Sequence, residues 1–354
     1  IDQYGNSATF SGVISDDVVG TAGRLVITNS NGNSGSVALS NTANSYSGGT
    51  EVQAGATLSI ASPLALGTGG VDLVGSSTVP ATLKTTVDMT LSAPITVAGD
   101  PVFNVAPSTT LTVTTPIADG ASAGDVVADG GGTLLLTAAN TYTGATNIDA
   151  GTLLQTGSLS TSTNVAMTGT AVWDLQVAQT VASLTMASVN SITNSTGTSS
   201  LAVSGTSTLA NSITTSGTQT YTGAVTLLAN TTLTTTDAAV TFADAVTGSG
   251  KSLTVSAGSG AISMSTVGVS GTSIGALTLN STGVTTLGGA VYAASVTTNA
   301  GGSVAINTTT VTTTGAQTYN DAVTLGANVA FTTTDSAVTF ADAVTGSGKS
   351  LTVS

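Results

Sequence analysis

The chain has 354 residues, and although 40% of them are hydrophobic, only 3% are aromatic and 6% are charged. This composition argues against a conventional globular core of rings and long aliphatic side chains, and the absence of cysteine excludes disulfides and thiolate metal sites. The net charge of −13 would repel a phosphate backbone, so nucleic acid is excluded as a partner.

The hydropathy pattern argues against two further classes of protein. The mean hydropathy of +0.40 is higher than is usual for disordered chains. No apolar run approaches the ~18 residues of a transmembrane helix, because Ser, Thr, Gly or Asn recurs every few positions, so we expect no transmembrane segment. The chain begins at Ile1 without Met or a signal-like segment, which predicts a processed chain or a fragment.

The first predicted part, residues 1–205, contains one sequence element twice. The segment Asn44-Ser-Tyr-Ser-Gly-Gly-Thr-Glu-Val-Gln-Ala-Gly-Ala-Thr-Leu58 recurs in divergent form from Asn140 to Leu154, 96 residues later. We place the two copies near residues 35–58 and 132–154.

All six prolines of the chain lie between these copies, in residues 63–116. Proline cannot donate to a strand ladder and is confined to strand ends, edges and turns. We therefore expect a zone of irregular loops over 63–116.

The second predicted part, residues 206–354, is built from a longer repeat. Residues 217–256 match residues 315–354 at an offset of 98. Because this offset is close to the 96 residues of the first part, we predict a common unit of about five coils of roughly 20 residues. The match runs to the last residue, which predicts a fragment of a longer chain.

The local pattern in both parts is that of short strands. Apolar and polar residues alternate in segments such as Leu111-Thr-Val-Thr114 and Leu277-Thr-Leu279, and Gly, Asn or Asp ends each run. Helix signals are almost missing. Small residues that stack from coil to coil favour a solenoid over a sandwich, so we predict an all-β parallel β-helix (β-solenoid) of roughly 15 to 18 coils.

The segment from Gly132 to Leu154 resembles the autotransporter-associated β-strand repeat, also called the passenger-associated transport repeat, and the copy that ends at Leu58 is similar. The resemblance implies a right-handed parallel β-helix in an exported passenger, hence a secreted, extracellular or cell-surface location. The tracts TYNDAVTL and VTFADAVTGSGKSLTVS of the second part resemble filamentous-haemagglutinin-like giant bacterial surface proteins.

Few residues are candidates for a chemical site. Asp125 and Asp129 flank a glycine-rich turn, and carboxylates with backbone carbonyls can bind Ca²⁺. The alternative to a calcium site is that both aspartates are exposed turn residues. We predict no catalytic and no cofactor-binding residue.

Two other motifs have a chemical and a structural interpretation. Asp16 and Asp17 would be the carboxylate pair of a carbohydrate-active β-helix enzyme, but the chain has no His and one Trp, so we interpret them as a solvated turn. The run Gly248-Ser-Gly-Lys-Ser252 superficially resembles a phosphate-binding loop, yet strand-like residues follow it, so we interpret it as a tight turn.

Four tyrosines occupy matching positions of the repeats: Tyr46 with Tyr142, and Tyr221 with Tyr319. An aligned row of exposed rings would suit stacking on a ligand. Regular placement is more typical of a residue that stacks inside the coils, and we predict that role.

Two long stretches, 175–236 and 252–320, carry no charge. Soluble β-proteins usually protect exposed strands with charge, so we expect either lateral packing of protomers or a hydroxyl-rich surface.

The leading functional hypothesis is a non-enzymatic extracellular structural protein that self-associates into a bacterial filament, sheath or surface layer. The first alternative is an adhesin passenger of an autotransporter or two-partner secretion type that contacts host cells or glycans, and the second is the carbohydrate-active enzyme.

Overall fold

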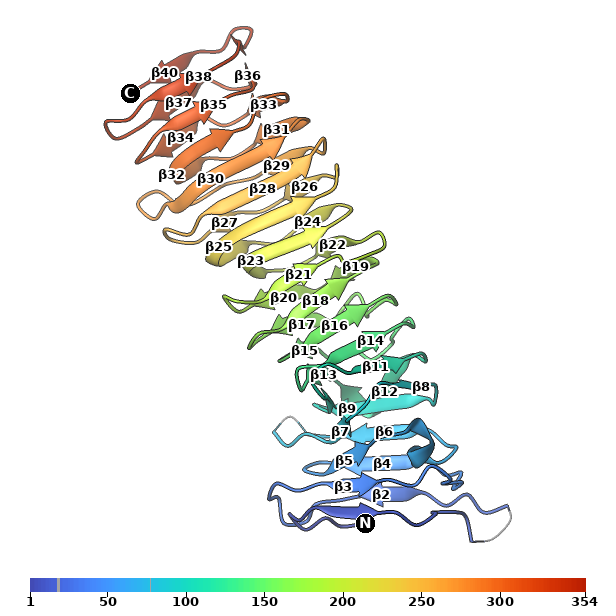
Figure 1. The fold of residues 1–354 in the computed structure, drawn as a ribbon. Coiled ribbons are helices and arrows are strands. Elements are labelled where there is room, and N and C mark those ends of the chain that lie inside the picture. Colours follow the sequence, from blue (N-terminus) through green and yellow to red (C-terminus); the bar gives the residue numbers. More distant parts are fainter. Residues whose placement is uncertain (18–19, 77) are drawn as a thin grey trace. The chain divides into compact units, whose positions relative to one another are not determined.

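The computed structural model describes residues 1–17, 20–76 and 78–354. It divides the chain into two compact units, Ile1–Asp174 and Leu175–Ser354, whereas the sequence repeats place a boundary at 205/206. Both units consist of short parallel strands wound into successive coils, about 16 in all (Figure 1). The fold is therefore the all-β parallel solenoid that the sequence predicts, and its right-handed winding stays a prediction.

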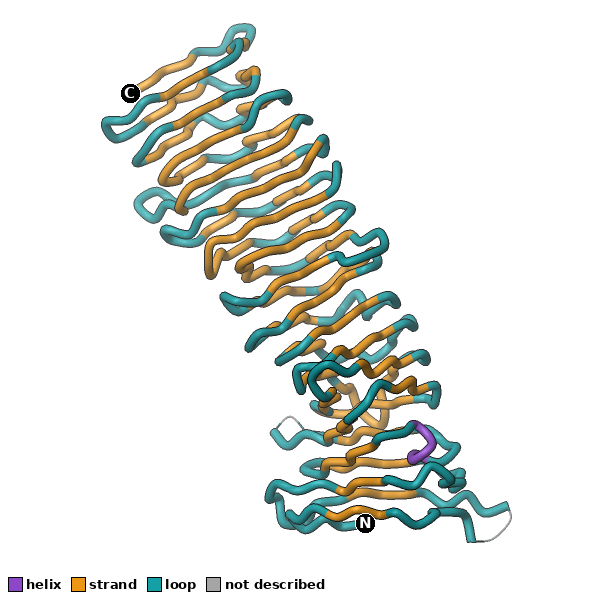
Figure 2. The backbone as a smooth tube through the Cα atoms, viewed as in Figure 1, coloured by secondary structure: helices purple, strands orange, loops and turns teal. Residues whose placement is uncertain are grey.

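The backbone trace shows strands joined by turns and loops of varied length around successive coils (Figure 2). The helical element of the described residues is one 3₁₀ turn, Pro63–Leu66, which Ser62 caps. Paired residues on successive coils lie between 18 residues apart, as in Leu201 and Gln219, and 29 residues apart, as in Ala8 and Val37. The coils therefore vary in length around the expected 20 residues.

The first unit has three strand columns, which we name faces A, B and C. Face A contains β1 (Ala8–Phe10), β3 (Val37–Leu39), β5 (Thr57–Ile60), β7 (Thr82–Thr85), β10 (Val102–Val105), β13 (Val126–Asp129), β15 (Thr146–Ile148) and β17 (Asn164–Met167). Face B contains β8 (Met89–Leu91), β11 (Thr110–Val113), β14 (Thr133–Leu136) and β16 (Thr152–Gln155). Face C contains β2 (Leu25–Ile27), β4 (Thr50–Gln53), β6 (Val71–Val74), β9 (Ile95–Gly99) and β12 (Ile117–Gly124). Strand β18 (Val172–Leu175) lies at the division between the units.

The second unit also has three columns, faces D, E and F. Face D contains β19 (Ala178–Val181), β22 (Ser200–Val203), β24 (Gln219–Tyr221), β26 (Val240–Phe242), β29 (Ile262–Met264), β31 (Val284–Leu287), β33 (Ser303–Ile306), β36 (Ala322–Leu325) and β39 (Val344–Thr345). The long strands β23 (Ser207–Thr215), β25 (Val225–Thr235) and β32 (Val291–Thr298) turn a corner, so their first halves lie on face E and their second halves on face F. Face E also contains β20 (Ser183–Met186), β27 (Val246–Thr247), β34 (Thr310–Thr313), β37 (Val329–Thr332) and β40 (Leu351–Val353), and face F contains β21 (Ser191–Thr193), β28 (Leu253–Gly258), most of β30 (Ile274–Ser281), β35 (Gln317–Tyr319) and β38 (Val338–Phe340).

The core consists of side chains stacked in register from coil to coil. Alternate residues of each strand point inward, as in β14, where Leu134 and Leu136 are buried. On face A the register aligns a buried column of Leu58, Leu83, Phe103, Ala128, Ile148 and Met167. Each fully buried large aliphatic or aromatic side chain stabilises the fold by roughly 1.5–3 kcal/mol relative to an exposed one, so a core without large clusters of rings is sufficient.

The prolines lie in turns and next to strands, but the zone 63–116 is not irregular. Six strands, β6 to β11, form between Val71 and Val113 in regular parallel register. Pro94 and Pro101 lie immediately before β9 and β10, where no ladder hydrogen bond needs their missing N–H. The expected loop zone was therefore wrong, because proline fits the corners of coils without interrupting them.

Face D of the second unit has a regular outer surface. The outward residues of face D pair in one register and are almost all hydroxyl residues or alanine: Thr180, Ala202, Thr220, Thr241, Ser263, Thr286, Ala305, Thr324 and Thr345. Strand neighbours are about 4.8 Å apart, so the hydroxyl groups form a closely spaced row. Hydroxyl groups thus take the place of charge on this face.

The two sequence repeats do not contain whole numbers of coils. In the 98-residue repeat, β24 on face D corresponds to β35 on face F, and β27 on face E corresponds to β39 on face D. Each strand therefore recurs one face before five full coils are complete, so the period is five coils less one face. In the 96-residue repeat, β4 on face C corresponds to β15 on face A, so that period is four coils plus one face. The predicted common unit of about five coils was wrong, because coil lengths vary and the two nearly equal spacings cover different fractions of a coil.

Candidate ligand-binding groove

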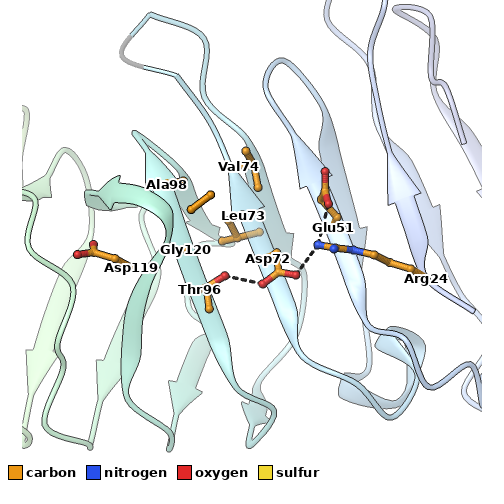
Figure 3. Close-up of a pocket in the computed structure, with 10 residues that line it drawn as sticks. Arg24, Glu51, Asp72, Leu73, Val74, Thr96, Ala98, Asp119 and Gly120 are labelled. Atoms are coloured by element: carbon orange, nitrogen blue, oxygen red, sulfur yellow. Dashed lines mark hydrogen bonds and ion pairs between the residues drawn. The ribbon is translucent and has the colours of Figure 1, made fainter. Parts of the chain in front are cut away.

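A groove of about 570 Å³ lies on the outer surface of face C in the first unit (Figure 3). It is lined by Arg24, Glu51, Asp72, Leu73, Val74, Thr96, Ala98, Asp119, Gly120 and Ala121. Its volume is within the range of about 300–1,000 Å³ that is common for small-molecule sites. These residues come from successive coils, so the groove depends on the stacking of the strands.

Parallel register places the polar side chains of the groove in one row. Glu51 of β4 pairs with Asp72 of β6, and Asp72 pairs with Thr96 of β9. The flanking residues Val52 and Leu73 are fully buried, and since side chains alternate along a strand, the polar row points outward. The alternation of inward and outward side chains along each strand therefore determines which of them line the groove.

A charged network connects the row. The Nη2 of Arg24 lies 2.7 Å from Oε2 of Glu51 and 2.5 Å from Oδ2 of Asp72. Thr96 donates its hydroxyl to Oδ1 of Asp72 at 2.5 Å, and Gln53 donates Nε2 to Oε1 of Glu51 at 2.7 Å. Two carboxylates opposite each other on neighbouring strands repel, and the shared guanidinium offsets this repulsion.

One wall of the groove is the irregular end of β12. The pairing of β12 with β9 shifts register between Asp119 and Gly124, and Gly120 and Ala121 lie in the shifted segment. Gly124 donates its N–H to Oδ1 of Asp119 at 3.0 Å, which closes the segment. A Cβ on Gly124 would lie 2.4 Å from the carbonyl carbon of Val97, so only glycine fits at this end of the wall.

Asp119 also connects this wall to the following coil. Oδ1 of Asp119 accepts the N–H of Thr143 at 3.0 Å, and Oδ2 accepts the Thr143 hydroxyl at 2.7 Å. Burial acts to raise the pKa of Asp119, but the hydrogen bonds from Thr143 and Gly124 outweigh burial, and the pKa is lowered. The carboxylate is therefore held ionised as part of the wall.

The first copy of the repeat has the same contacts. Asp16 accepts hydrogen bonds from the N–H of Gly23 at 2.7 Å and from the hydroxyl of Ser47 at 2.7 Å, and Ser47 is the counterpart of Thr143. These bonds, chiefly that from Ser47, lower the pKa of Asp16. Asp16 thus bonds to Gly23 and to Ser47 of the following coil, and its neighbour Asp17 is exposed.

The conserved residues of both repeat copies form a buried turn. Asn44 and Asn140 accept the N–H groups of Ile14 and Ile117 at 2.9 and 3.0 Å. The hydroxyls of Tyr46 and Tyr142 each lie 2.6 Å from the threonine four residues later. Both tyrosines are at most 2% exposed, and burial raises the pKa of each.

The tyrosines of the longer repeat are also in the core. Tyr221 and Tyr319 are fully buried, and their rings stack on Phe242 and Phe340 with ring centroids 5.2 Å apart in both cases. The predicted core position is therefore confirmed for the tyrosines of both repeats, and ring stacking is found for Tyr221 and Tyr319.

The two calcium candidates lie at the ends of β13. Asp125 accepts the N–H of Ala145 at 2.8 Å and Nδ2 of Asn147 at 3.2 Å, and Asp129 accepts Nδ2 of Asn104 at 2.9 Å. Burial, with a contribution from Asp100, raises the pKa of Asp125. In the described ranges no group of three or more His, Cys, Asp or Glu side chains could hold a metal ion, and the calcium site stays a prediction.

The run Gly248–Ser252 forms a turn between β27 and β28. Lys251 donates its N–H to the carbonyl of Gly248 at 3.0 Å, and a strand follows at Leu253. A phosphate-binding loop leads into a helix, so the interpretation as a turn is confirmed.

Sequence reasoning missed the groove. Arg24 and Glu51 are the only arginine and the only glutamate of the chain, and both line it. Their rarity was the available signal. It could not be used because the coils between Arg24, Glu51 and Asp72 differ in length, so spacing does not show that these residues share a face.

Comparison with known proteins identifies the repeated turn. Residues 33–60 and 126–154 match the passenger-associated transport repeat, in agreement with the copies expected near 35–58 and 132–154. Such repeats imply a chain that is secreted or exposed at the cell surface.

The chain is also similar to the adhesin BmaC autotransporter of Brucella suis biovar 1 (strain 1330), with 39% identity over 131 residues. The similarity covers 36% of this chain and 4% of that protein. No solved structure matches the chain. Within the described residues, no helix has the length and hydropathy of a membrane span.

Proposed function

We propose that this chain is a β-helical segment of an adhesin passenger of the autotransporter type, and that it contacts host-cell surfaces through side chains on its outer faces. The observation that carries the proposal is the pair of passenger-associated transport repeats, which build the same turn on two coils. Similarity to an autotransporter adhesin supports it. These comparisons favour the adhesin over the filament, sheath or surface layer that leads from sequence alone.

The chain acts by presenting a surface, not by catalysis. Glu51 and Asp72 are both ion-paired with the one arginine, and the chain has no histidine. The groove therefore has the character of a binding surface.

Self-association is the second candidate function. The row of hydroxyl residues on face D has no charge that would oppose lateral packing of two chains. Sedimentation velocity at rising protein concentration separates the two functions: an adhesin segment stays monomeric, whereas a filament or layer subunit forms larger species.

The adhesin proposal is tested by coating beads with the purified 354-residue chain and counting the beads bound to cultured epithelial cells. The expected result is saturable binding that free chain inhibits. Beads coated with an unrelated acidic protein of similar size are the control. Equal binding of both bead types would refute the proposal.

A further inference from the structure

We propose that the groove on face C binds a neutral oligosaccharide. This inference rests on the proposed adhesin function and adds the chemical class of the ligand. Its basis is the charge, the hydrogen-bonding groups and the apolar surface that the strand register brings together on face C.

The charge of the groove selects against anions. The lining residues carry one guanidinium, that of Arg24, and three carboxylates, those of Glu51, Asp72 and Asp119. The whole chain carries a net charge of −13. Sialylated or sulfated glycans would meet repulsion both at the groove and at long range, so a neutral glycan fits better.

The charge pairs also select against a free cation. Both carboxylates of the row already have Arg24 as their ion-pair partner. A metal ion or a basic side chain would have to displace Arg24 and leave its guanidinium unpaired. A neutral ligand needs no such exchange.

The groove offers acceptors and donors side by side, as sugar hydroxyls require. Each carboxylate oxygen of Glu51 and Asp72 receives one hydrogen bond from the protein and has a further lone pair for a ligand. Among the described residues both ion pairs of Arg24 use Nη2, which leaves N–H donors on Nη1 and Nε. A hydroxyl group both donates and accepts, so it can bond to both kinds of partner at once.

The row is also held in place before a ligand arrives. The side chains of Glu51 and Asp72 are 18% and 33% exposed, and the side chain of Arg24 is 42% exposed. Hydrogen bonds from Gln53 and Thr96 fix the two carboxylates. Binding therefore costs little ordering of side chains.

The floor and wall add apolar surface beside the polar row. Val74 and Ala98 pair across β6 and β9, and both line the groove together with Ala121 of the wall. Sugar rings have C–H faces that pack on such surface while their hydroxyls reach the polar row. A volume of about 570 Å³ accommodates more than one ring.

The test uses the full chain and a panel of neutral di- to tetrasaccharides of galactose, glucose and N-acetylhexosamines, together with their sialylated and sulfated forms. Saturation-transfer NMR detects binding, and calorimetry measures affinity. We expect at least one neutral member to bind, and its sialylated form to bind more weakly. Glu51→Gln and Asp72→Asn should each lower the affinity about tenfold or more.

Lys84 provides the matched control. It lies in a second groove of about 440 Å³ on face A, among Ser and Thr residues. Lys84→Ala should leave the affinity unchanged. Circular dichroism and thermal unfolding check the fold of each variant. Ala121→Trp places a bulky side chain at a residue that lines the groove and should also abolish binding.

Three results would overturn the inference: no neutral member binds, the anionic forms bind as well as the neutral ones, or the affinity survives both Asp72→Asn and Ala121→Trp. The bead assay keeps this inference separate from the proposed function. Beads that adhere although no neutral glycan binds overturn the groove inference alone. Glycan binding without bead adhesion supports the groove inference and overturns the adhesin proposal.

Discussion

The hydroxyl of Tyr142 lies 2.6 Å from Oγ1 of Thr146, inside the core and four residues along the same turn. Thr146 also lies 3.1 Å from Thr163 Oγ1 on the next coil. Tyr46 and Thr50 repeat the first contact at the same distance. The passenger-associated repeat is thus a buried polar turn that is hydrogen-bonded to the coils around it.

Thr146→Val should lower the free energy of unfolding by about 1–3 kcal/mol, because it leaves the buried tyrosine hydroxyl without its partner. Tyr142→Phe combined with Thr146→Val should lower it by less than the sum of the two single changes. Urea unfolding of the four proteins in this double-mutant cycle measures the coupling. Additive losses would show that the hydroxyl pair contributes nothing.

Gly144→Ala should destabilise the same turn by about 1–3 kcal/mol, as overpacking does. An added Cβ would lie 2.3 Å from Oδ1 of Asp125 and 2.4 Å from the carbonyl oxygen of Gly124. Gly12→Ala is the control, since no atom lies within 4 Å of its added Cβ. Thermal unfolding should distinguish the two variants, and equal melting temperatures would contradict the close packing.

Acid should weaken the contacts that Asp16 and Asp119 make with the following coil. The folded-state pKa of each is lowered from an unfolded value of about 3.9, so their contribution is present above that pH and is lost as pH falls through the folded pKa. The double variant Asp16→Asn with Asp119→Asn should therefore be less stable at neutral pH. Its stability should fall less steeply than that of the parent chain below about pH 4, as measured by urea unfolding at each pH.

Arg24→Ala should destabilise the first unit by about 1 kcal/mol, since Glu51 and Asp72 then repel without a shared cation. Adding Asp72→Asn to this variant should restore part of the loss. High salt should reduce the difference between Arg24→Ala and the parent chain. A loss that salt leaves unchanged would point to packing of the arginine side chain instead of charge.

Cysteine pairs can check the face assignment of the longer repeat. Ala305 and Thr324 are paired neighbours on face D, whereas Thr318, the counterpart of Thr220, lies on face F. Ala305→Cys with Thr324→Cys should form a disulfide on mild oxidation, because paired strand residues are close enough for one. Ala305→Cys with Thr318→Cys should not, and efficient bonding of that second pair would contradict the assignment.

The fold class could be predicted from the sequence because its signals are local. Alternation in β14 and the copied Asn-x-Tyr turns act within a few residues, and the core tyrosines follow from them. The groove could not, because Arg24, Glu51 and Asp72 belong to different coils of different length. The loop zone failed for a related reason: Pro94 and Pro101 sit at corners, and sequence alone does not show where corners fall.

The 98-residue repeat does not contain a whole number of coils, so the number of its copies determines the direction in which the residues after it point. One copy is five coils less one face. In a solenoid that gained or lost one copy, the later residues would therefore keep their sequence but would lie on the neighbouring face of the coil. Three copies together would bring them back to the starting direction. Recombination between repeats could therefore reorient a binding surface without any substitution in it.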